Sequence, residues 1–169
     1  MVDEKFLLDA NSLITPYENF YPFDLAPGFW RQLFPLLSTE RVAILDSVKD
    51  EILKGDDELT IWIKSIPNLN ICSKKNEDVL QNYAKILSYI QTSEKYTERA
   101  LREWSKVTVA DPWLIAAAST YGYTIITFEK SLGSISNATN RPKIPDIAKQ
   151  FDVKCENLYY LMRNAGVCL

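Results

Sequence analysis

The stretch Lys5-Phe6-Leu7-Leu8-Asp9-Ala10-Asn11-Ser12 decides the fold of this chain. Three consecutive apolar residues, Phe6 to Leu8, run directly into the carboxylate of Asp9. A short apolar run of this kind predicts a strand that is buried on both faces, as strands in parallel sheets are. Asp9 then stands at the carboxyl end of the strand, which is where ligands bind in open α/β sheets.

Length and composition restrict the class of protein. A chain of 169 residues is long enough for one domain with a proper core, so we predict a single domain over residues 1–169. The hydrophobic content of 47% excludes a disordered chain. No apolar run approaches the ~20 residues of a membrane span, and the acidic start does not resemble a signal peptide. We therefore expect a cytoplasmic protein without a membrane partner.

The absence of histidine narrows the chemistry further. It excludes histidine-based catalytic triads and histidine-ligated zinc sites. The three cysteines form no Cys-x-x-Cys pair, and no glycine-rich phosphate loop is present. The net charge of −3 neither indicates nor excludes a nucleic acid partner. What remains is chemistry based on carboxylates, lysine, or a metal ion held by oxygen ligands.

A second acidic side chain follows the next apolar run, residues 42–45. Asp46 or Ser47 is expected to cap a short helix there. Glu51 lies three residues after Val48 and so shares its apolar face. Taken alone, Glu51 is explained more simply as an edge residue with its carboxylate in water.

A third and a fourth acid lie further along the chain. Asp111 and Pro112 open a helix that is apolar nearly all round, and Asp at the N-cap with Pro at the next position are both favoured. Residues 123–128 carry the strongest strand signal, and they run directly into Glu129 as the first strand runs into Asp9. Strands that alternate with helices predict an α/β domain of three layers with a mainly parallel sheet.

The segment after Asp9 combines helical and turn signals. Asn11 to Ile14 predicts the start of a helix that Pro16 interrupts. Residues 15–28 contain three prolines and four aromatic residues, which predicts an ordered loop with its rings packed on the domain.

The four acids are expected to meet at one edge of the sheet. Each has an ordinary explanation alone, since a cap such as Asp111 is worth ~1 kcal/mol. Together in a partly buried cleft they would repel one another and lose hydration. Mg²⁺ or Mn²⁺ relieves such a cluster, and two ions ~3.5–4 Å apart activate a water and stabilise the leaving oxygen of a phosphodiester.

Four blocks of the chain resemble, in order, the signature blocks of PIN domains. They cover residues 6–13, 48–52, 111–118 and 124–129, and the first and third are the most specific. PIN domains are single-domain α/β/α nucleases that depend on metal ions, and many prokaryotic ones resemble VapC-type toxins, ribonucleases blocked by an antitoxin. The resemblance implies that four acidic side chains hold the metal: Asp9, Glu51, Asp111 and Glu129.

The resemblance also implies accessory residues. Asn11 and Thr127 fall where the family usually has polar side chains that orient the site. The fourth acid is usually Asp, and here it is Glu129, so Asp146 is an alternative for that position. The chain is longer than a typical toxin, and its added segments are candidates for an antitoxin site, a dimer contact or substrate selection.

We therefore predict a Mg²⁺- or Mn²⁺-dependent endoribonuclease, the toxin of a toxin–antitoxin pair. Its expected partners are an RNA substrate, an antitoxin protein and a second copy in a homodimer. One alternative is a catalytically weak PIN scaffold that acts through protein contacts. Another alternative is a phosphohydrolase of the haloacid dehalogenase type. Asn11 argues against it, because those enzymes are expected to have a second Asp at that position.

Overall fold

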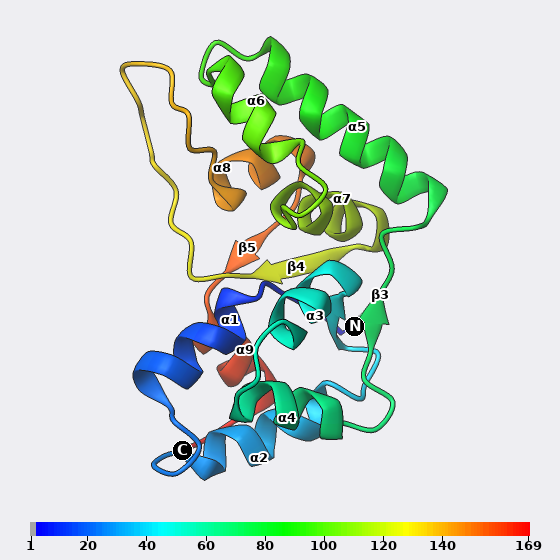
Figure 1. Cartoon of the computed structure of the whole chain (residues 1–169), viewed down its shortest axis with the longest axis vertical. Coiled ribbons are helices and arrows are strands. Elements are labelled where there is room, and N and C mark those ends of the chain that lie inside the picture. The colour runs from blue at the N-terminus through cyan, green and yellow to red at the C-terminus, as the bar shows by residue number, and fades with distance from the viewer. Residues whose placement is uncertain (1–2) are drawn as a thin grey trace.

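A parallel sheet runs through the centre of the computed structural model, which describes residues 3–169 (Figure 1). Its strands lie in the order β3-β2-β1-β4-β5, and every neighbouring pair is parallel. The strands are β1 (Lys5–Leu8), β2 (Val42–Leu45), β3 (Ile71–Cys72), β4 (Tyr123–Ile126) and β5 (Cys155–Glu156). Helices cover both faces of the sheet (Figure 1), so the predicted three-layer α/β/α fold is confirmed.

The central strand β1 joins the two halves of the sheet. Its residues Phe6 to Leu8 are completely buried, as the apolar run predicts. Leu8 pairs with Ile44 of β2 and with Ile126 of β4, so β1 and β4 end in register and β2 continues for one more residue. The chain extends the sheet first through β2 and β3 and then, on the other side of β1, through β4 and β5. The order reverses at β1, and this reversal is where open α/β sheets form their ligand crevice.

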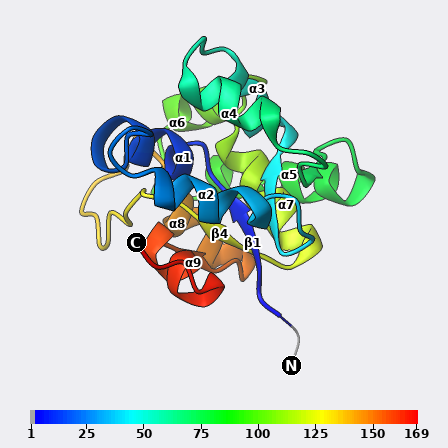
Figure 2. The same ribbon diagram turned by 90° about the horizontal axis from the view of Figure 1, so that it is seen from below.

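One layer of helices lies below the sheet in Figure 1. In Figure 2, which views the molecule from below, α1, α2 and α9 lie on the side of the sheet that faces the viewer. The helices of this layer are α1 (Asn11–Thr15), the π-helix η1 (Pro16–Phe20), α2 (Pro27–Leu36), α4 (Glu58–Ser65) and α9 (Leu158–Ala165). Helix α3 (Asp46–Leu53) begins directly after β2, at the carboxyl edge of the sheet.

The second layer lies above the sheet in Figure 1. It contains α5 (Glu77–Thr92), α6 (Glu98–Trp104), α7 (Asp111–Tyr121), α8 (Ile144–Ala148) and the short 3₁₀ helix η2 (Lys149–Phe151). Helix α7 is the innermost of these: its residues 112–118 are buried, as its almost uniformly apolar sequence predicts. Among the helices of residues 3–169, none combines the length and the apolar character that a membrane crossing requires.

The segment after Asp9 differs from the prediction. Helix α1 ends at Thr15, directly before Pro16 as predicted, but the chain stays helical because the π-helix η1 begins at Pro16. The backbone N–H of Tyr21 donates to the carbonyl of Pro16, five residues back, at 2.6 Å. Pro16 fits because it is the first residue of η1, where an N–H is not needed. The segment 15–28 is therefore partly helical. The rings of Tyr17, Tyr21 and Phe23 pack against the core as predicted, with Tyr21 4.7 Å from Phe29 between ring centroids, whereas Phe20 is exposed.

Candidate active site

Asp9 is the first residue after β1, and its side chain is only 6% exposed. Its backbone N–H donates to the carbonyl of Ile126 at 2.9 Å, which holds it beside the end of β4. Thr127 Oγ1 donates to Asp9 Oδ2 at 2.8 Å. Burial raises the pKa of Asp9 to about 6; the bond from Thr127 opposes this rise, and the charges of Glu129 and Glu51 add to it. The site therefore contains a carboxylate that is costly to ionise.

Asp111 is the first residue of α7, and its side chain is half-buried. The predicted N-cap role is wrong: Ala110 occupies the N-cap position, and no side chain caps the helix. Burial raises the pKa of Asp111 to about 7, and the charges of Asp9, Glu129 and Glu51 raise it further, whereas Lys143 opposes them. Capping thus does not explain this carboxylate, and its strongest charged neighbour is Asp9.

Glu51 lies at the rim of the site on α3. Val48 and Ile52 are buried as predicted, but Glu51 is exposed, so the expectation that it lies on the inner face of the helix is wrong. Three residues along a helix correspond to a rotation of ~300°, which is ~60° short of a full turn. Glu51 is therefore offset by ~60° from Val48, which is enough to move its side chain from the buried face to the edge of that face. The charge of Glu51 still raises the pKa of both Asp9 and Asp111, after the larger effect of burial. Glu51 therefore faces the other acids from the solvent side.

The carboxylate of Glu129 is bound by residues at the end of the loop 130–143. Strand β4 ends at Ile126, so Glu129 is the third residue beyond the strand and does not repeat the geometry of Asp9. Its Oε2 accepts from the backbone N–H of Ile144 at 2.8 Å, and its Oε1 lies 3.3 Å from Lys143 Nζ. Glu129 thus fastens the end of the loop 130–143 beside the site while adding negative charge to it.

Asn11 and Thr127 lie in one hydrogen-bond network with Asp9. Asn11 Nδ2 donates to Thr127 Oγ1 at 3.3 Å, and Asn11 Oδ1 accepts from the backbone N–H of Phe128 at 2.9 Å. The backbone N–H of Glu129 donates to Thr127 Oγ1 at 3.1 Å. The network holds the turn after β4 against the start of α1, and it fixes the orientation of the Asp9 carboxylate.

Asp146, the alternative fourth acid, makes its contacts elsewhere. Its Oδ2 accepts from the backbone N–H of Leu132 at 3.0 Å, and its Oδ1 accepts from Ser131 Oγ. After the larger effect of burial, its charge contributes to the raised pKa of Tyr96, on the far side of the loop. The structure thus uses Asp146 to hold the first turn of the loop 130–143, and Glu129 is the fourth acid that faces Asp9 and Asp111.

A comparison with known protein families gives a match over nearly the whole of this fold. A family model described as "Domain of unknown function (DUF4411)" matches residues 6–169. The chain belongs to the DUF4411 family. The match begins inside β1 and contains all the acidic residues of the site, so the DUF4411 domain and the described fold are the same unit. The family description assigns no activity, and the chemistry must be argued from the site.

The acids of the DUF4411 domain fit a hydrated divalent cation. Within residues 3–169 no three acidic or cysteine side chains are placed together as a ready-made metal group. Mg²⁺, however, is usually held by one or two carboxylates and keeps several waters. Asp9 and Asp111 supply two such carboxylates, and their raised pKa values show that positive charge would stabilise both. Glu129 fits less well as a ligand because Lys143 already pairs with it.

The pairing of Lys143 with Glu129 is a feature of the site that the sequence did not predict. Lys143 is half-buried, and its charge lowers the pKa of Asp111, against the larger opposing effects of burial and of the other acids. Glu129 and Lys143 lie 14 positions apart in the sequence, at the two ends of a polar loop. No local pattern joins two residues at that separation, so only the folded loop reveals the pair.

Proposed function

We propose that this DUF4411 domain is a Mg²⁺- or Mn²⁺-dependent endoribonuclease that hydrolyses RNA phosphodiester bonds at a PIN-like site. One observation carries the proposal: Asp9 and Asp111 lie together at the carboxyl edge of the sheet, and the pKa of each is raised, mainly by burial. Such carboxylates lower the stability of the fold unless a ligand compensates them. Strongly shifted acids in this position are typical of functional sites.

The donor set selects the reaction class. Without histidine, the chain offers carboxylates as its acid–base groups at this edge. A bound divalent cation would supply Lewis-acid activation of a water and would neutralise charge on the phosphate. Asp9 and Asp111 would hold the cation, and Thr127 and Asn11 keep Asp9 oriented through their hydrogen bonds. Glu51 adds negative charge from the rim.

Basic side chains beside the acids support a phosphodiester substrate. Lys143 contacts Glu129 with part of its side chain in solvent, and the neighbouring loop contributes Lys130, which is exposed. Such lysines neutralise phosphates and supply most of the affinity for nucleic acid. We propose that the domain acts as the toxin of a toxin–antitoxin pair. The basis is the resemblance of four blocks of the chain to PIN domains, many of which resemble VapC-type toxins.

The test is cleavage of a panel of single-stranded and structured RNAs with Mn²⁺, with Mg²⁺ and with EDTA. Wild-type protein is compared with Asp9→Asn and with Asp50→Asn, a matched control that removes one charge from an exposed position on α3. We expect cleavage by wild type and Asp50→Asn with metal, and none with EDTA or with Asp9→Asn. Cleavage that survives Asp9→Asn would place the activity outside this site.

A second candidate is a catalytically weak PIN-like scaffold that acts through an antitoxin or a dimer. It is favoured by the contacts of Glu129, whose carboxylate is already satisfied by Lys143 and by the N–H of Ile144. Titration calorimetry with Mn²⁺ separates the two candidates. Saturable heat that Asp9→Asn abolishes supports the nuclease, whereas the scaffold predicts no saturable heat.

A further inference from the structure

A pocket of about 570 Å³ adjoins the carboxylates along the same edge of the sheet. Its wall includes Thr127 and Glu129, which belong to the candidate site, and the residues at the end of β5, Cys155 to Asn157. The volume lies within the ~300–1,000 Å³ that small-molecule sites occupy. The pocket therefore shares two residues with the candidate site and is large enough for part of a substrate.

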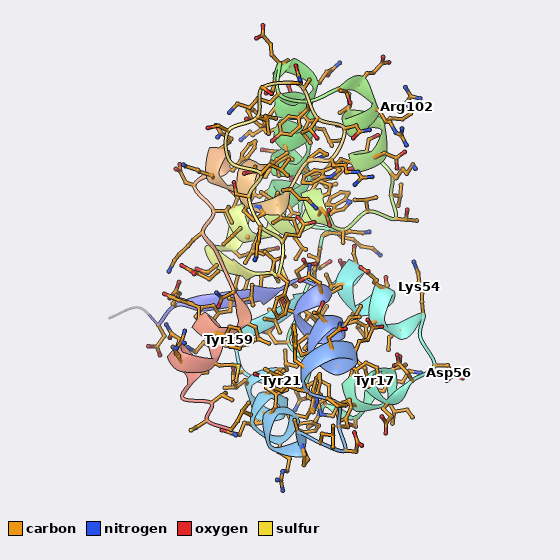
Figure 3. All side chains as sticks on the ribbon, turned by 90° about the vertical axis from the view of Figure 1, so that its left-hand side faces the viewer. Tyr17, Tyr21, Lys54, Asp56, Arg102 and Tyr159 are labelled. Atoms are coloured by element: carbon orange, nitrogen blue, oxygen red, sulfur yellow. The ribbon has the colours of Figure 1, made fainter. Side chains whose placement is uncertain are left out.

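Three aromatic side chains from three elements contribute to this pocket. Phe20 ends η1 and is 50% exposed, Tyr159 lies on α9 and is 42% exposed, and Phe128 follows β4. The rings of Phe20 and Phe128 are 6.0 Å apart between centroids. Figure 3 shows Tyr159 beside Tyr21, and Tyr159 adds to the raised pKa of Tyr21 after the larger effect of burial. Exposed rings gathered round one hollow indicate a binding surface.

The rings are held by the same contacts that organise the acids. The π-helix η1 places the ring of Phe20 next to that of Phe128. π-Helical turns are rare in proteins, and those that occur are often found at functional sites. The backbone N–H of Phe128 is bound by Asn11, which also contacts Thr127. Because Thr127 in turn binds Asp9, the position of the rings is coupled to the position of the carboxylate.

The polar part of the wall does not favour a phosphate. It carries Glu129 and Glu156 as well as Lys130, so it has no excess of positive charge. An uncharged planar group with a polar edge suits aromatic faces and such mixed polar atoms better than an anion does. A nucleobase has this chemistry, and base stacking on aromatic side chains is the usual way in which proteins take up unpaired RNA bases.

We propose that this aromatic pocket takes one unpaired base of the RNA, next to the phosphodiester at the carboxylates. The inference rests on the proposed function and narrows its substrate class to single-stranded segments and loops. A base inside a duplex is stacked on both faces and cannot enter without being turned out of the helix. Duplex RNA should accordingly bind more weakly than the same strand alone.

The test measures RNA binding by fluorescence anisotropy in EDTA, so it does not depend on cleavage. The probes are a labelled single-stranded hexanucleotide and the same oligomer made entirely of abasic nucleotides. The proteins are wild type, Phe20→Ala, Phe20→Trp and Leu25→Ala, the last a matched control because Leu25 is exposed and does not contribute to the pocket. Circular dichroism and thermal melting show whether each variant is folded.

We expect Phe20→Ala to weaken binding of the normal hexanucleotide about 10-fold, the scale of one stacked base. The abasic oligomer should bind wild type and Phe20→Ala equally, and Phe20→Trp should restore the affinity for the normal one. Leu25→Ala should change neither. Equal loss for both oligomers, or no loss with folded Phe20→Ala, would overturn the base pocket, as would the absence of any RNA binding.

The outcome is separable from that of the proposed nuclease. Metal-dependent cleavage that Asp9→Asn abolishes, combined with no base-dependent effect of Phe20→Ala, leaves the nuclease standing and removes the pocket. A base-dependent effect of Phe20→Ala, combined with no cleavage by metal-loaded protein, supports an RNA-binding pocket on a domain that is not a nuclease.

Discussion

The two ends of β1 carry carboxylates in opposite situations. Glu4 precedes the strand, and its carboxylate accepts from Thr124 Oγ1 at 2.7 Å, from Tyr160 Oη at 2.7 Å and from Lys154 Nζ at 3.2 Å. Burial raises the pKa of Glu4, but these bonds outweigh burial and hold the pKa below its ordinary value. Asp9 follows the strand with Thr127 as its side-chain donor, and there burial prevails and the pKa rises to about 6.

The difference shows which acid the fold uses for its own stability. At the amino end of β1 the surrounding side chains supply donors, so the ionised Glu4 stabilises the folded state. At the carboxyl end burial outweighs the hydrogen bond from Thr127, so the ionised Asp9 costs stability. Of the two acids, Asp9 is the one whose environment is typical of functional sites.

The largest effect that separates the two ends is on RNA cleavage. Asp9→Asn should lower the rate of Mn²⁺-dependent cleavage by about 100-fold or more, the range seen when one charge-stabilising group leaves an active site. Glu4→Gln should leave the rate within a factor of about two, because Glu4 lies at the opposite edge of the sheet. The rates are compared at saturating Mn²⁺ and equal folded concentration. A large loss of cleavage rate in a folded Glu4→Gln variant would contradict the assignment of Glu4 to stability and of Asp9 to the reaction.

The second effect is a pH dependence of stability with a definite sign. Between its ordinary value of 3.8 and its folded value of about 6, Asp9 binds more protons in the folded state than in the unfolded state. The free energy of unfolding in EDTA should therefore fall as pH rises through this range, by about 3 kcal/mol for a shift of two units. Asp111 extends the fall to about pH 7.

Urea denaturation at half-unit steps from pH 4 to pH 8 measures this fall. Mn²⁺ should reverse it at pH 7.5, adding about 2.7 kcal/mol at 100 Kd, and should have little effect at pH 5, where protons compete with the metal. Asp9→Asn should flatten the profile in EDTA. A profile that rises from pH 4 to pH 7 in wild type and in Asp9→Asn alike would mean that the acids are not coupled as described.

The third effect concerns Glu4, the acid at the amino end of β1, whose carboxylate is stabilised by hydrogen bonds. Glu4→Gln should lower the free energy of unfolding at pH 7.5 by about 1–2 kcal/mol, because it weakens charge-assisted bonds to Tyr160 and Lys154 in a partly exposed position. Since the folded pKa of Glu4 lies below 4.5, this stability is present above pH 4.5 and is lost as pH falls through the folded pKa. Urea melts of wild type and Glu4→Gln, measured at half-unit steps downward from pH 7.5, should therefore differ most above pH 4.5 and approach each other as the pH falls below it.

The smallest effect is expected at the rim. Glu51→Gln should raise the Mn²⁺ concentration for half-maximal cleavage about 10-fold, the scale of outer positions around a metal, with a smaller change in maximal rate. Asp50→Asn, the exposed neighbour, should not change it. If Glu51→Gln equals Asp9→Asn in its effect, Glu51 binds the metal directly and moves inward when the ion is present.

Local patterns were sufficient to place Asp9. An apolar run that ends in an acid has few other interpretations, and the strand that it forms is buried as predicted. The register that pairs Leu8 with Ile44 and with Ile126 was not predicted, because it depends on contacts between strands. The features that depend on one segment alone were therefore accessible from the sequence.

The details of the site depend on contacts that no single segment contains. Asp111 and Pro112 suit the cap and first position as well as the first and second positions of a helix, and packing of α7 selected the latter. Glu129 was expected to resemble Asp9, but Lys143 and Ile144 bind it from across the loop. The exposure of Glu51 likewise depends on how α3 is rotated about its axis, which hydrophobic periodicity fixes only approximately.

The bond between Thr127 and Asp9 has a consequence for biosynthesis. The two residues are 118 positions apart, and the strand that brings Thr127 to Asp9 pairs directly with the first strand. Because domains generally fold as units, a chain emerging from the ribosome cannot bring Thr127 to Asp9 until β4 has been released. If the domain degrades RNA, a partly synthesised chain is harmless, and the ribosome is not exposed to it before translation has nearly finished.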